Sequence, residues 1–416
     1  MRIAVIRAKT LDILGVSGYI EVNTGVRVIA RQGAVNAEKT PEGRTHVCPN
    51  LIRIIPAEGV MKHFKLFIIF LALVAVVGCS KRSHDGPAAD GSPADRSGRA
   101  NEVVVYAYDS FVSEWGPGPA LEELFTAQTG YKLTFISAGD AVQVLSRAEM
   151  EKNAPQADVI LGVDNNLLAR AKQAGVAESY KPQSASDIPA HLILDPDWQF
   201  VPFDWSYFAF IYDSESASRV TPPASLEDLT KSEYAKKIIL MDPRASTPGL
   251  GFASWTVAAL GENYLDYWQA LKPNILTMAP GWSSGYGLFT EGEAPLVISY
   301  TTSPPYHVEY DKTSRYKALI FEQGHPMQVE FAAVVKGAPN KQGAQAFVDF
   351  LLSVDAQNAL PLTQWMYPAN KNAALPQSFS AGGTFLPANA AVTKTLSADP
   401  LITAKAVDEI MRLLAE

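Results

Sequence analysis

Strand-like and helix-like segments alternate along the chain from residue 102 onward. Apolar runs at 102–108 and 157–163 have the length of buried strands, and a further strand is predicted at Lys132–Ser137. Helix-forming stretches at 122–129 and 142–152 separate the three strands. This alternation is typical of parallel strands that are joined by crossover helices. It predicts an α/β protein built around a parallel sheet.

Small or polar residues follow each of these predicted strands, where the chain would leave the sheet. They are Asp109 and Ser110 after the first strand, Gly139 and Asp140 after the second, and Asp164 and Asn165 after the third. Ligands of open parallel sheets bind outside the carboxyl ends of the strands. We therefore expect a binding cleft at this edge of the sheet.

Two later apolar runs are predicted to connect this sheet to a second group of elements. The run 200–213 is long enough to cross between two lobes, and Leu296–Tyr300 would cross back. The first lobe would then consist of 102–206 plus 301–416, and the second lobe would be the continuous segment 207–300. The expected fold class is α/β, with two lobes of mixed or parallel sheets joined by a two-strand hinge.

A helix N-terminus is predicted at Ser246 and Thr247, after the short strand Ile238–Met241. Thr247 followed by Pro248 fits an N-cap residue with proline at the first helical position. The free N–H groups of a helix N-terminus attract anions, so Ser246 and Thr247 could hold an oxygen atom or a phosphate group. A plain helix cap explains the same residues without a ligand.

The stretch 281–307 concentrates aromatic residues among serine, threonine, proline and glycine. Trp282, Tyr286, Tyr300 and Tyr306 belong to it, and they follow no clear strand or helix period. Aromatic faces and small hydroxyls suit a concave site for a flat, polar and cationic molecule. An ordinary core with turn residues would show the same composition.

The whole-chain composition narrows the classes of ligand. The chain has 416 residues, of which 47% are hydrophobic, and its net charge is -8. That length can hold two domain-sized units or one large one. The acidic balance and the lack of long Lys/Arg runs argue against nucleic acid as a partner and slightly favour a cation.

A short apolar segment ends just before Cys79. It begins with basic residues after Met61, and its apolar run 66–78 is too short to span a bilayer but has the length of a secretory signal. The sequence VVGC at its end resembles the bacterial lipobox, in which the cysteine is lipidated. We expect 61–78 to be a lipoprotein signal peptide and Cys79 to be a lipid anchor in a membrane.

The segments on either side of this signal do not indicate a folded domain. Residues 1–60 show no clear periodicity, and we expect them to be a misassigned upstream translation with Met61 as the true initiator. The stretch 79–101 is small and polar and is expected to be a flexible tether. The only other cysteine is Cys48, so a mature chain that begins at Cys79 would form no disulfide.

Several motifs together resemble a known family, the thiamine-binding proteins of bacterial thiamine transporters. The likeness runs from about residue 103 to 368, and its motifs are YAYDSF with WGPGP, ADVILGVDNNLL, FVPFDWSYFAFIYD, DPRASTPGLG, GWSSGYGLF, ISYTTSPPYH and QWMYP. The resemblance implies a type II periplasmic-binding-protein fold that closes on thiamine or its phosphates. It also implies delivery to an ABC permease with its ATPase, a monomeric state and a periplasmic location, here with a lipid anchor.

The resemblance also implies which residues bind the ligand and suggests the chemistry of each. The thiazolium ring is a permanent cation that aromatic faces can bind, Asp140 could accept a hydrogen bond from the aminopyrimidine, and hydroxyls could donate to the tail. One position departs from the family, because Ala141 stands where glycine is frequent. The implied ligand-binding residues are Asp140, Ala141, Ser246, Thr247, Trp282, Tyr300, Thr301, Thr302, Ser303, Pro304, Tyr306 and Trp365.

Ferric iron, a polyamine and an enzymatic role are the alternatives to thiamine binding. Ferric iron would require a tyrosine pair near a carboxylate or histidine, and Tyr300, Tyr306 and His307 fit this only weakly. A polyamine would require several carboxylates, and the motifs carry few. No GxSxG, HExxH or CxxC motif is present, and a thiamine-processing enzyme with a cysteine nucleophile would need a cysteine beyond Cys79. We expect no enzymatic activity, cofactor or metal.

Overall fold

The computed structural model describes residues 19–22, 26–29, 100–218, 220–379 and 394–416. The chain divides into two units, residues 1–91 and 92–416. In the first unit, β1 (Tyr19–Val22) pairs with β2 (Val26–Ile29) in an antiparallel ladder. The predicted signal peptide, the predicted lipid-anchor residue Cys79 and nearly all of the predicted tether lie outside the described residues.

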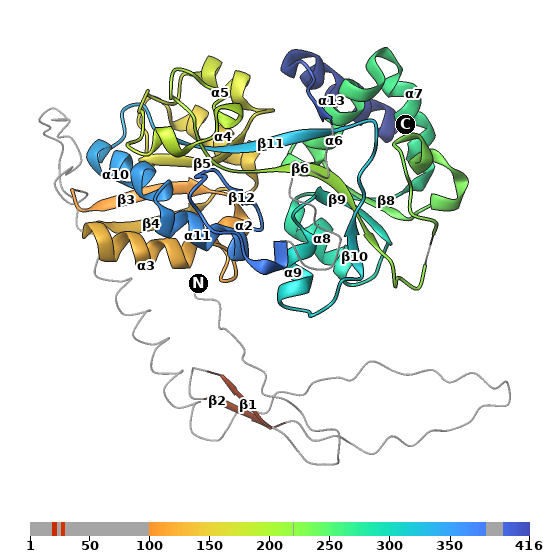
Figure 1. Cartoon of the computed structure of the whole chain (residues 1–416), viewed down its shortest axis with the longest axis horizontal. Coiled ribbons are helices and arrows are strands. Elements are labelled where there is room, and N and C mark those ends of the chain that lie inside the picture. The colour runs from red at the N-terminus through yellow and green to blue at the C-terminus, as the bar shows by residue number, and fades with distance from the viewer. Residues whose placement is uncertain (1–18, 23–25, 30–99, 219, 380–393) are drawn as a thin grey trace, which may run out of the picture. The chain divides into compact units, whose positions relative to one another are not determined.

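The second unit is organised around one mixed sheet (Figure 1). Its main strand order is β4-β3-β5-β11-β6-β9-β7-β8, with β10 and β12 paired to β6 and β13 paired to β11. The strands are β3 Glu102–Ala107, β4 Lys132–Ser137, β5 Val159–Asp164, β6 Val201–Asp213, β7 Ile238–Met241, β8 Ile275–Ala279, β9 Leu296–Tyr300, β10 Tyr316–Ala318, β11 His325–Val334, β12 Tyr367–Pro368 and β13 Thr395–Leu396.

Helices cover this sheet in two groups, which we call the first and second lobes. In the first lobe lie α2 Asp109–Val112, α3 Gly118–Thr129, α4 Ala141–Glu151, α5 Leu168–Ala174, α10 Lys341–Leu351 and α11 Val354–Thr363. In the second lobe lie α6 Thr247–Leu260, α7 Tyr264–Leu271, α8 Trp282–Thr290, α9 Pro304–Glu309 and α13 Pro400–Ala415. Short 3₁₀ turns are η2 Ala185–Asp187, η3 Ala190–Leu192, η4 Glu227–Thr230, η5 Ser232–Tyr234, η6 Gly261–Asn263, η7 Lys272–Asn274 and η8 Gln377–Phe379.

The first lobe has the arrangement that the alternating pattern predicted. Strand β3 pairs in parallel with β4 and β5, and helices α3 and α4 form the crossovers. Every residue of β5 is buried, which explains why this strand is an uninterrupted apolar run. Helix α3 starts at Gly118, before the predicted 122–129, because Pro119 is well tolerated in the first turn of a helix.

Strands β6 and β11 run side by side from one lobe into the other (Figure 1). They pair antiparallel from Met327 opposite Tyr207 to Ala332 opposite Val201, with a register shift after Glu330. The predicted return crossing at Leu296–Tyr300 is therefore wrong. That segment is β9, which stays in the second lobe between β6 and β7.

Part of the segment 301–416 lies in the second lobe, in contrast to the predicted division. Strand β10 pairs with the second-lobe end of β6 at Ile211 to Asp213. Helix α13 packs against α6 and α7, and a hydrogen bond joins Tyr264 to Glu409. The physical reason is that α13 carries an apolar stripe with Val407 and Ile410 buried against these helices.

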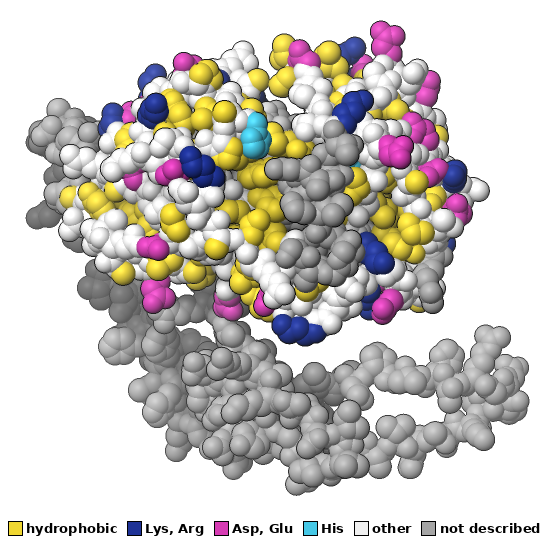
Figure 2. Space-filling view, in the orientation of Figure 1, with side chains coloured by type: hydrophobic (Ala, Val, Ile, Leu, Met, Phe, Trp, Pro, Cys, Tyr) yellow, Lys and Arg dark blue, Asp and Glu magenta, His cyan; other side chains and the backbone are white. Residues whose placement is uncertain are grey.

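The surface of the second unit mixes charges of both signs. On the face that Figure 2 presents, Lys/Arg and Asp/Glu side chains are interspersed over the described residues of both lobes. None of the helices in the described ranges is both long enough and apolar enough to cross a membrane.

Candidate ligand-binding site

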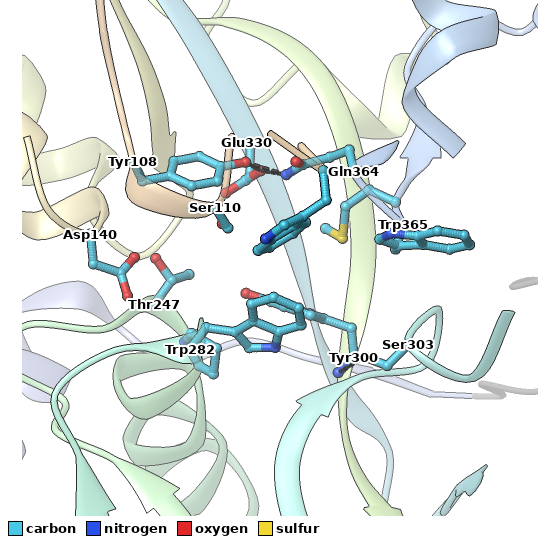
Figure 3. Close-up of a pocket in the computed structure, with 13 residues that line it drawn as sticks. Tyr108, Ser110, Asp140, Thr247, Trp282, Tyr300, Ser303, Glu330, Gln364 and Trp365 are labelled. Atoms are coloured by element: carbon cyan, nitrogen blue, oxygen red, sulfur yellow. Dashed lines mark hydrogen bonds between the residues drawn. The ribbon is translucent and has the colours of Figure 1, made fainter. Parts of the chain in front are cut away.

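A pocket lies between the two lobes, close to the carboxyl ends of the first-lobe strands. It encloses about 540 Å³ of empty space, part of which opens to solvent. Figure 3 shows that its walls come from both lobes and from the loop after α11. The lining residues are Tyr108, Ser110, Trp115, Asp140, Thr247, Pro248, Trp282, Tyr300, Ser303, Glu330, Gln364, Trp365 and Met366.

Asp140 reaches the pocket from the N-terminus of α4. Its carboxylate accepts a hydrogen bond from the Ala141 amide at 2.8 Å, and its own amide donates to the Gln143 side chain at 3.0 Å, completing a capping box. Burial raises the pKa of Asp140, and the bond from Ala141 offsets part of this rise. The nearby Ser246 side chain and Trp282 backbone of the second lobe also lower this pKa, so the Asp140 carboxylate faces groups from both lobes.

The N-terminus of α6 forms another part of the wall. The N-cap is Ser246 rather than the predicted Thr247, because Ser246 has extended backbone angles and the helix already begins at Thr247. The Thr247 side chain is buried and lines the pocket, and its hydroxyl has no hydrogen-bond partner among the described residues. A buried hydroxyl is normally hydrogen-bonded, so Thr247 and the free N–H groups beside it are available to a ligand oxygen.

Trp282 begins α8 and is held firmly in the second lobe. Its indole N–H donates to the Ser299 hydroxyl at 2.8 Å, and its ring stacks on Tyr286 with centroids 5.0 Å apart. The Tyr286 hydroxyl lies 2.9 Å from Nε2 of His307, which fixes the tyrosine in turn. Trp115 of the first lobe approaches Trp282 with centroids 6.2 Å apart, so two indoles face each other across the cleft.

The hydroxyl-rich segment after β9 divides into pocket residues and internal residues. Tyr300 and Ser303 line the pocket, and the Tyr300 ring packs on Phe208 at 5.3 Å. The Thr301 and Thr302 hydroxyls instead lie 3.2 and 2.9 Å from the buried Ser206 hydroxyl on β6. These two threonines therefore stabilise the contact between β9 and β6 and do not line the pocket.

The loop after α11 closes the opposite side of the pocket. Trp365 is only 7% exposed, so its indole is held inside the protein. Its backbone has a φ of 62°, so the chain turns sharply and carries the indole toward the cleft. Tyr306, 37% exposed, packs edge-on against Trp365 at 5.2 Å and lies outside the pocket lining, as does Tyr310.

Glu330 lies on the floor of the pocket and was not identified from the sequence. The Tyr108 hydroxyl donates to it at 2.8 Å, the Gln328 amide donates at 3.1 Å, and the Gln364 amide contacts both Tyr108 and Glu330 (Figure 3). Burial raises the pKa of Glu330, and the bond from Tyr108 offsets part of that rise. The available signal was a glutamate inside the otherwise apolar run 329–335, because a buried charge is costly unless it is paired or hydrogen-bonded.

Six of the twelve implied ligand residues line the pocket, namely Asp140, Thr247, Trp282, Tyr300, Ser303 and Trp365. The other six support it or lie beside it: Ala141, Ser246, Thr301, Thr302, Pro304 and Tyr306. Ser110 was predicted to lie at the end of the first strand, and further lining residues lie inside the motifs that carry the resemblance but were not predicted as ligand contacts: Tyr108, Trp115, Gln364 and Met366. The described residues contain no cluster of three or more His, Cys, Asp or Glu side chains arranged to hold a metal ion.

Comparisons with known proteins agree with this architecture. The family described as "Bacterial extracellular solute-binding protein" matches residues 120–388. The "Thiamine-binding periplasmic protein" of Brucella melitensis is 40% identical over 318 residues, which cover 76% of this chain and 90% of that protein. The Escherichia coli protein of the same name is 42% identical over 278 residues, covering 67% and 83% of the two chains.

A solved structure titled "Periplasmic thiamin binding protein" superposes with a TM-score of 0.68 at 38% identity, covering 76% of this chain and 96% of that one. The "Iron uptake protein A1" of Synechocystis is more distant, at 26% identity. Ferric-binding proteins at about 20% identity share the fold alone. The expected fold is confirmed: the chain belongs to the bacterial extracellular solute-binding protein family and has the type II periplasmic-binding-protein fold.

Proposed function

We propose that the protein captures thiamine, or its phosphates, in the cleft between the lobes and delivers it to an ABC permease and its ATPase. The observation that carries this proposal is the pocket itself, in which indole and phenol rings surround a carboxylate-rich floor. Relatives that cover most of their own length carry the name thiamine-binding periplasmic protein. The aromatic and acidic lining and the names of these relatives both favour a flat aromatic cation as the ligand.

The pocket offers a complementary group for each part of thiamine. Trp282, Tyr300 and Trp365 can stack on its rings, and a cation over a desolvated aromatic face gains about 0.5–2 kcal/mol. Asp140 is placed to accept a hydrogen bond from the exocyclic amine of the pyrimidine. The Thr247 hydroxyl and the N-terminus of α6 suit the hydroxyl or phosphate at the other end.

The test is calorimetric titration of the purified chain with thiamine and its mono- and diphosphates. Micromolar or tighter binding is expected, and Trp282→Ala or Tyr300→Ala should weaken it at least about tenfold, or about 1.4 kcal/mol. Tyr131→Ala is the matched control, because it removes a partly buried ring that packs on Phe125 away from the pocket. Unchanged affinity in both pocket variants would refute the assigned site.

Spermidine and ferric citrate serve as competing ligands in the same titration. Spermidine is included because Glu330 adds a carboxylate to the pocket beside Asp140, which the motifs already contained. Tighter binding of either compound than of thiamine would overturn the proposed ligand. No turnover of thiamine is expected, in keeping with a binding protein rather than an enzyme.

The proposed location is the periplasm, with a monomeric protein attached to a membrane through lipidated Cys79. The support is the lipobox-like sequence VVGC after a short apolar run. Cys79→Ser should move the protein from the membrane fraction to the soluble periplasmic fraction. An unchanged distribution between these fractions would remove the lipid anchor from the proposal.

A further inference from the structure

Three acidic side chains form a row across three neighbouring strands beneath the pocket. Glu330 on β11 is the register partner of Asp164 on β5 and of Asp204 on β6. Register partners project from the same face of a sheet and lie within side-chain reach of each other. Asp164 and Asp204 are 0% exposed and Glu330 is 4% exposed. We call these three residues the acidic row.

No cationic side chain balances the acidic row. Within the described ranges, none of its three members forms an ion pair with Lys, Arg or His. The ionisable and polar groups that face it are Tyr108 just after β3, Asp140 at the N-cap of α4, Tyr300 from β9, Gln328 from β11 and Gln364 from the loop after α11. All of these groups are neutral or acidic, so the protein itself supplies no compensating positive charge.

The members of the row differ in how well their oxygens are satisfied. Asp164 accepts hydrogen bonds from the amides of Asn166 and Leu167 at 3.0 and 3.1 Å, which fold the turn after β5. Neither carboxyl oxygen of Asp204 has a hydrogen-bond partner of good geometry in the described part of the chain. Asp204 is thus held opposite Glu330, which lines the pocket, with fewer hydrogen bonds than Asp164 has.

Protons neutralise part of the row in the absence of a ligand. Burial raises the pKa of Asp204 and Glu330, and the negative charge of Glu330 raises that of Asp204 further. Burial also raises the pKa of Asp164 to about 6, although its hydrogen bonds from Asn166 and Leu167 lower it in part. Like charges this close in a dry environment cannot all be ionised without a nearby cation.

We propose that the acidic row selects ligands by charge, because a cation entering the pocket above Glu330 takes the place of a proton held by the row. The O–H bond of one carboxyl group breaks, its proton passes to the buffer, and the carboxylate remains beside the ligand cation. This inference rests on the proposed function, and it adds that thiamine capture is coupled to proton release. A neutral molecule of the same shape would gain nothing from the row.

The expected size of the effect follows from the general behaviour of carboxyl groups. A positive charge within about 4–6 Å favours the ionised form by roughly 10- to 1000-fold. The affinity for thiamine should therefore rise with pH, by up to about tenfold per pH unit between pH 6 and 8, while the row retains a proton in the empty protein. Up to about one proton per ligand should be released near pH 7.

The experiment is calorimetry of the full chain at pH 7 in phosphate and in Tris, two buffers with different heats of ionisation. The ligands are thiamine and a neutral isostere in which a thiophene ring replaces the thiazolium. For thiamine the heat should differ between the buffers in proportion to the proton released, and for the isostere it should not. Equal heats for thiamine in both buffers would overturn the inference, while tight binding would leave the proposed function standing.

Two variants locate the effect at the row. Glu330→Gln keeps an oxygen that can accept the hydrogen bond of Tyr108, and it should abolish the buffer dependence and reduce the preference for thiamine over the isostere at least tenfold. Glu151→Gln is the matched control, because Glu151 accepts a hydrogen bond from Tyr106 at 2.9 Å in the same way but does not line the pocket. Proton release that persists in Glu330→Gln would refute the assignment to the row. If thiamine failed to bind the unaltered protein, both the function and this inference would fall.

Discussion

Gly162 is a position where one added methyl group should disturb both the fold and the pocket. It lies inside β5 with a φ of +100°, and a Cβ atom built there would stand 2.2 Å from Cδ1 and 2.3 Å from Cε1 of Tyr108. The Tyr108 ring cannot move freely, because its hydroxyl bonds to Glu330 and its edge packs on Phe111 at 5.6 Å. Gly162→Ala must therefore strain the backbone and displace a pocket residue.

The cost of Gly162→Ala can be assembled from three contributions. A positive φ costs an alanine about 1–2 kcal/mol, overpacking a filled core costs about 1–3 kcal/mol, and losing a buried hydrogen bond costs about 1–3 kcal/mol. Partial relaxation makes these contributions less than additive, so a loss of about 2–5 kcal/mol in the free energy of unfolding is expected. Displacement of Tyr108 should also weaken thiamine binding at least about tenfold.

The matched control is Gly175→Ala. Gly175 has a φ of +66° at the end of α5, and a Cβ atom there would have no neighbour within 4 Å. Only the backbone penalty remains, so about 1 kcal/mol should be lost with no change in affinity. Urea unfolding and thiamine titration of both variants provide the comparison. Equal losses of stability with unchanged affinity in both would refute the reasoning about Tyr108.

Three further substitutions have calculable outcomes. Burial lowers the pKa of His325 to about 4, although Nδ1 donates to the Phe208 carbonyl. The stability that neutral His325 contributes should be complete above about pH 6.5 and decline as the pH falls toward 4. Urea unfolding at several pH values should show this decline in the unaltered protein and not in His325→Asn. Burial would raise the pKa of Asp195, but hydrogen bonds from Lys172 and from backbone amides outweigh it and hold the pKa below the usual range. Asp195→Asn should lower the free energy of unfolding by about 1–3 kcal/mol at pH 7, and by less as the pH falls through that pKa. Equal stability of the two proteins at pH 7 would contradict this assignment. Thr247→Val removes a buried hydroxyl that has no hydrogen-bond partner among the described residues. The variant should melt at a slightly higher temperature and bind thiamine or its phosphates more weakly. A lower melting temperature would show that the hydroxyl already has a partner in the protein.

Local patterns predicted the strands well because a buried strand is visible in its own residues. Lys132–Ser137 and Ile238–Met241 have the predicted bounds. Ile238–Met241 is a fully buried apolar run, whereas Lys132–Ser137 mixes polar and apolar residues and is only partly buried. The start of β11 could not be predicted because His325 and Gln328 interrupt its apolar character. Both side chains are buried and hydrogen-bonded, His325 to the Phe208 carbonyl of β6 and Gln328 by donating to Glu330 on the same strand. This is why the strand that returns from the second lobe to the first was wrongly predicted at Leu296–Tyr300, a continuous apolar run.

Some pocket residues could be predicted from local sequence patterns, and others could not. Trp282 and Tyr300 could be predicted because aromatic residues outside a regular period suggest a surface that binds something. Whether a hydroxyl faces the cleft or a neighbouring strand depends on tertiary pairing, which is why Thr301 and Thr302 were assigned to the ligand but contact Ser206. The acidic row is a product of strand register, and no local pattern reveals register between segments distant in sequence.

The position of α13 has a practical consequence for following the protein at work. The described second unit begins in the first lobe, just before β3, and the chain ends on the second lobe after α13 (Figure 1). A fluorescent donor at residue 101 and an acceptor at residue 416 would therefore sit on different lobes, on opposite sides of the cleft. Energy transfer between them would report cleft closure directly, and would make the chain a reagentless sensor for its own ligand.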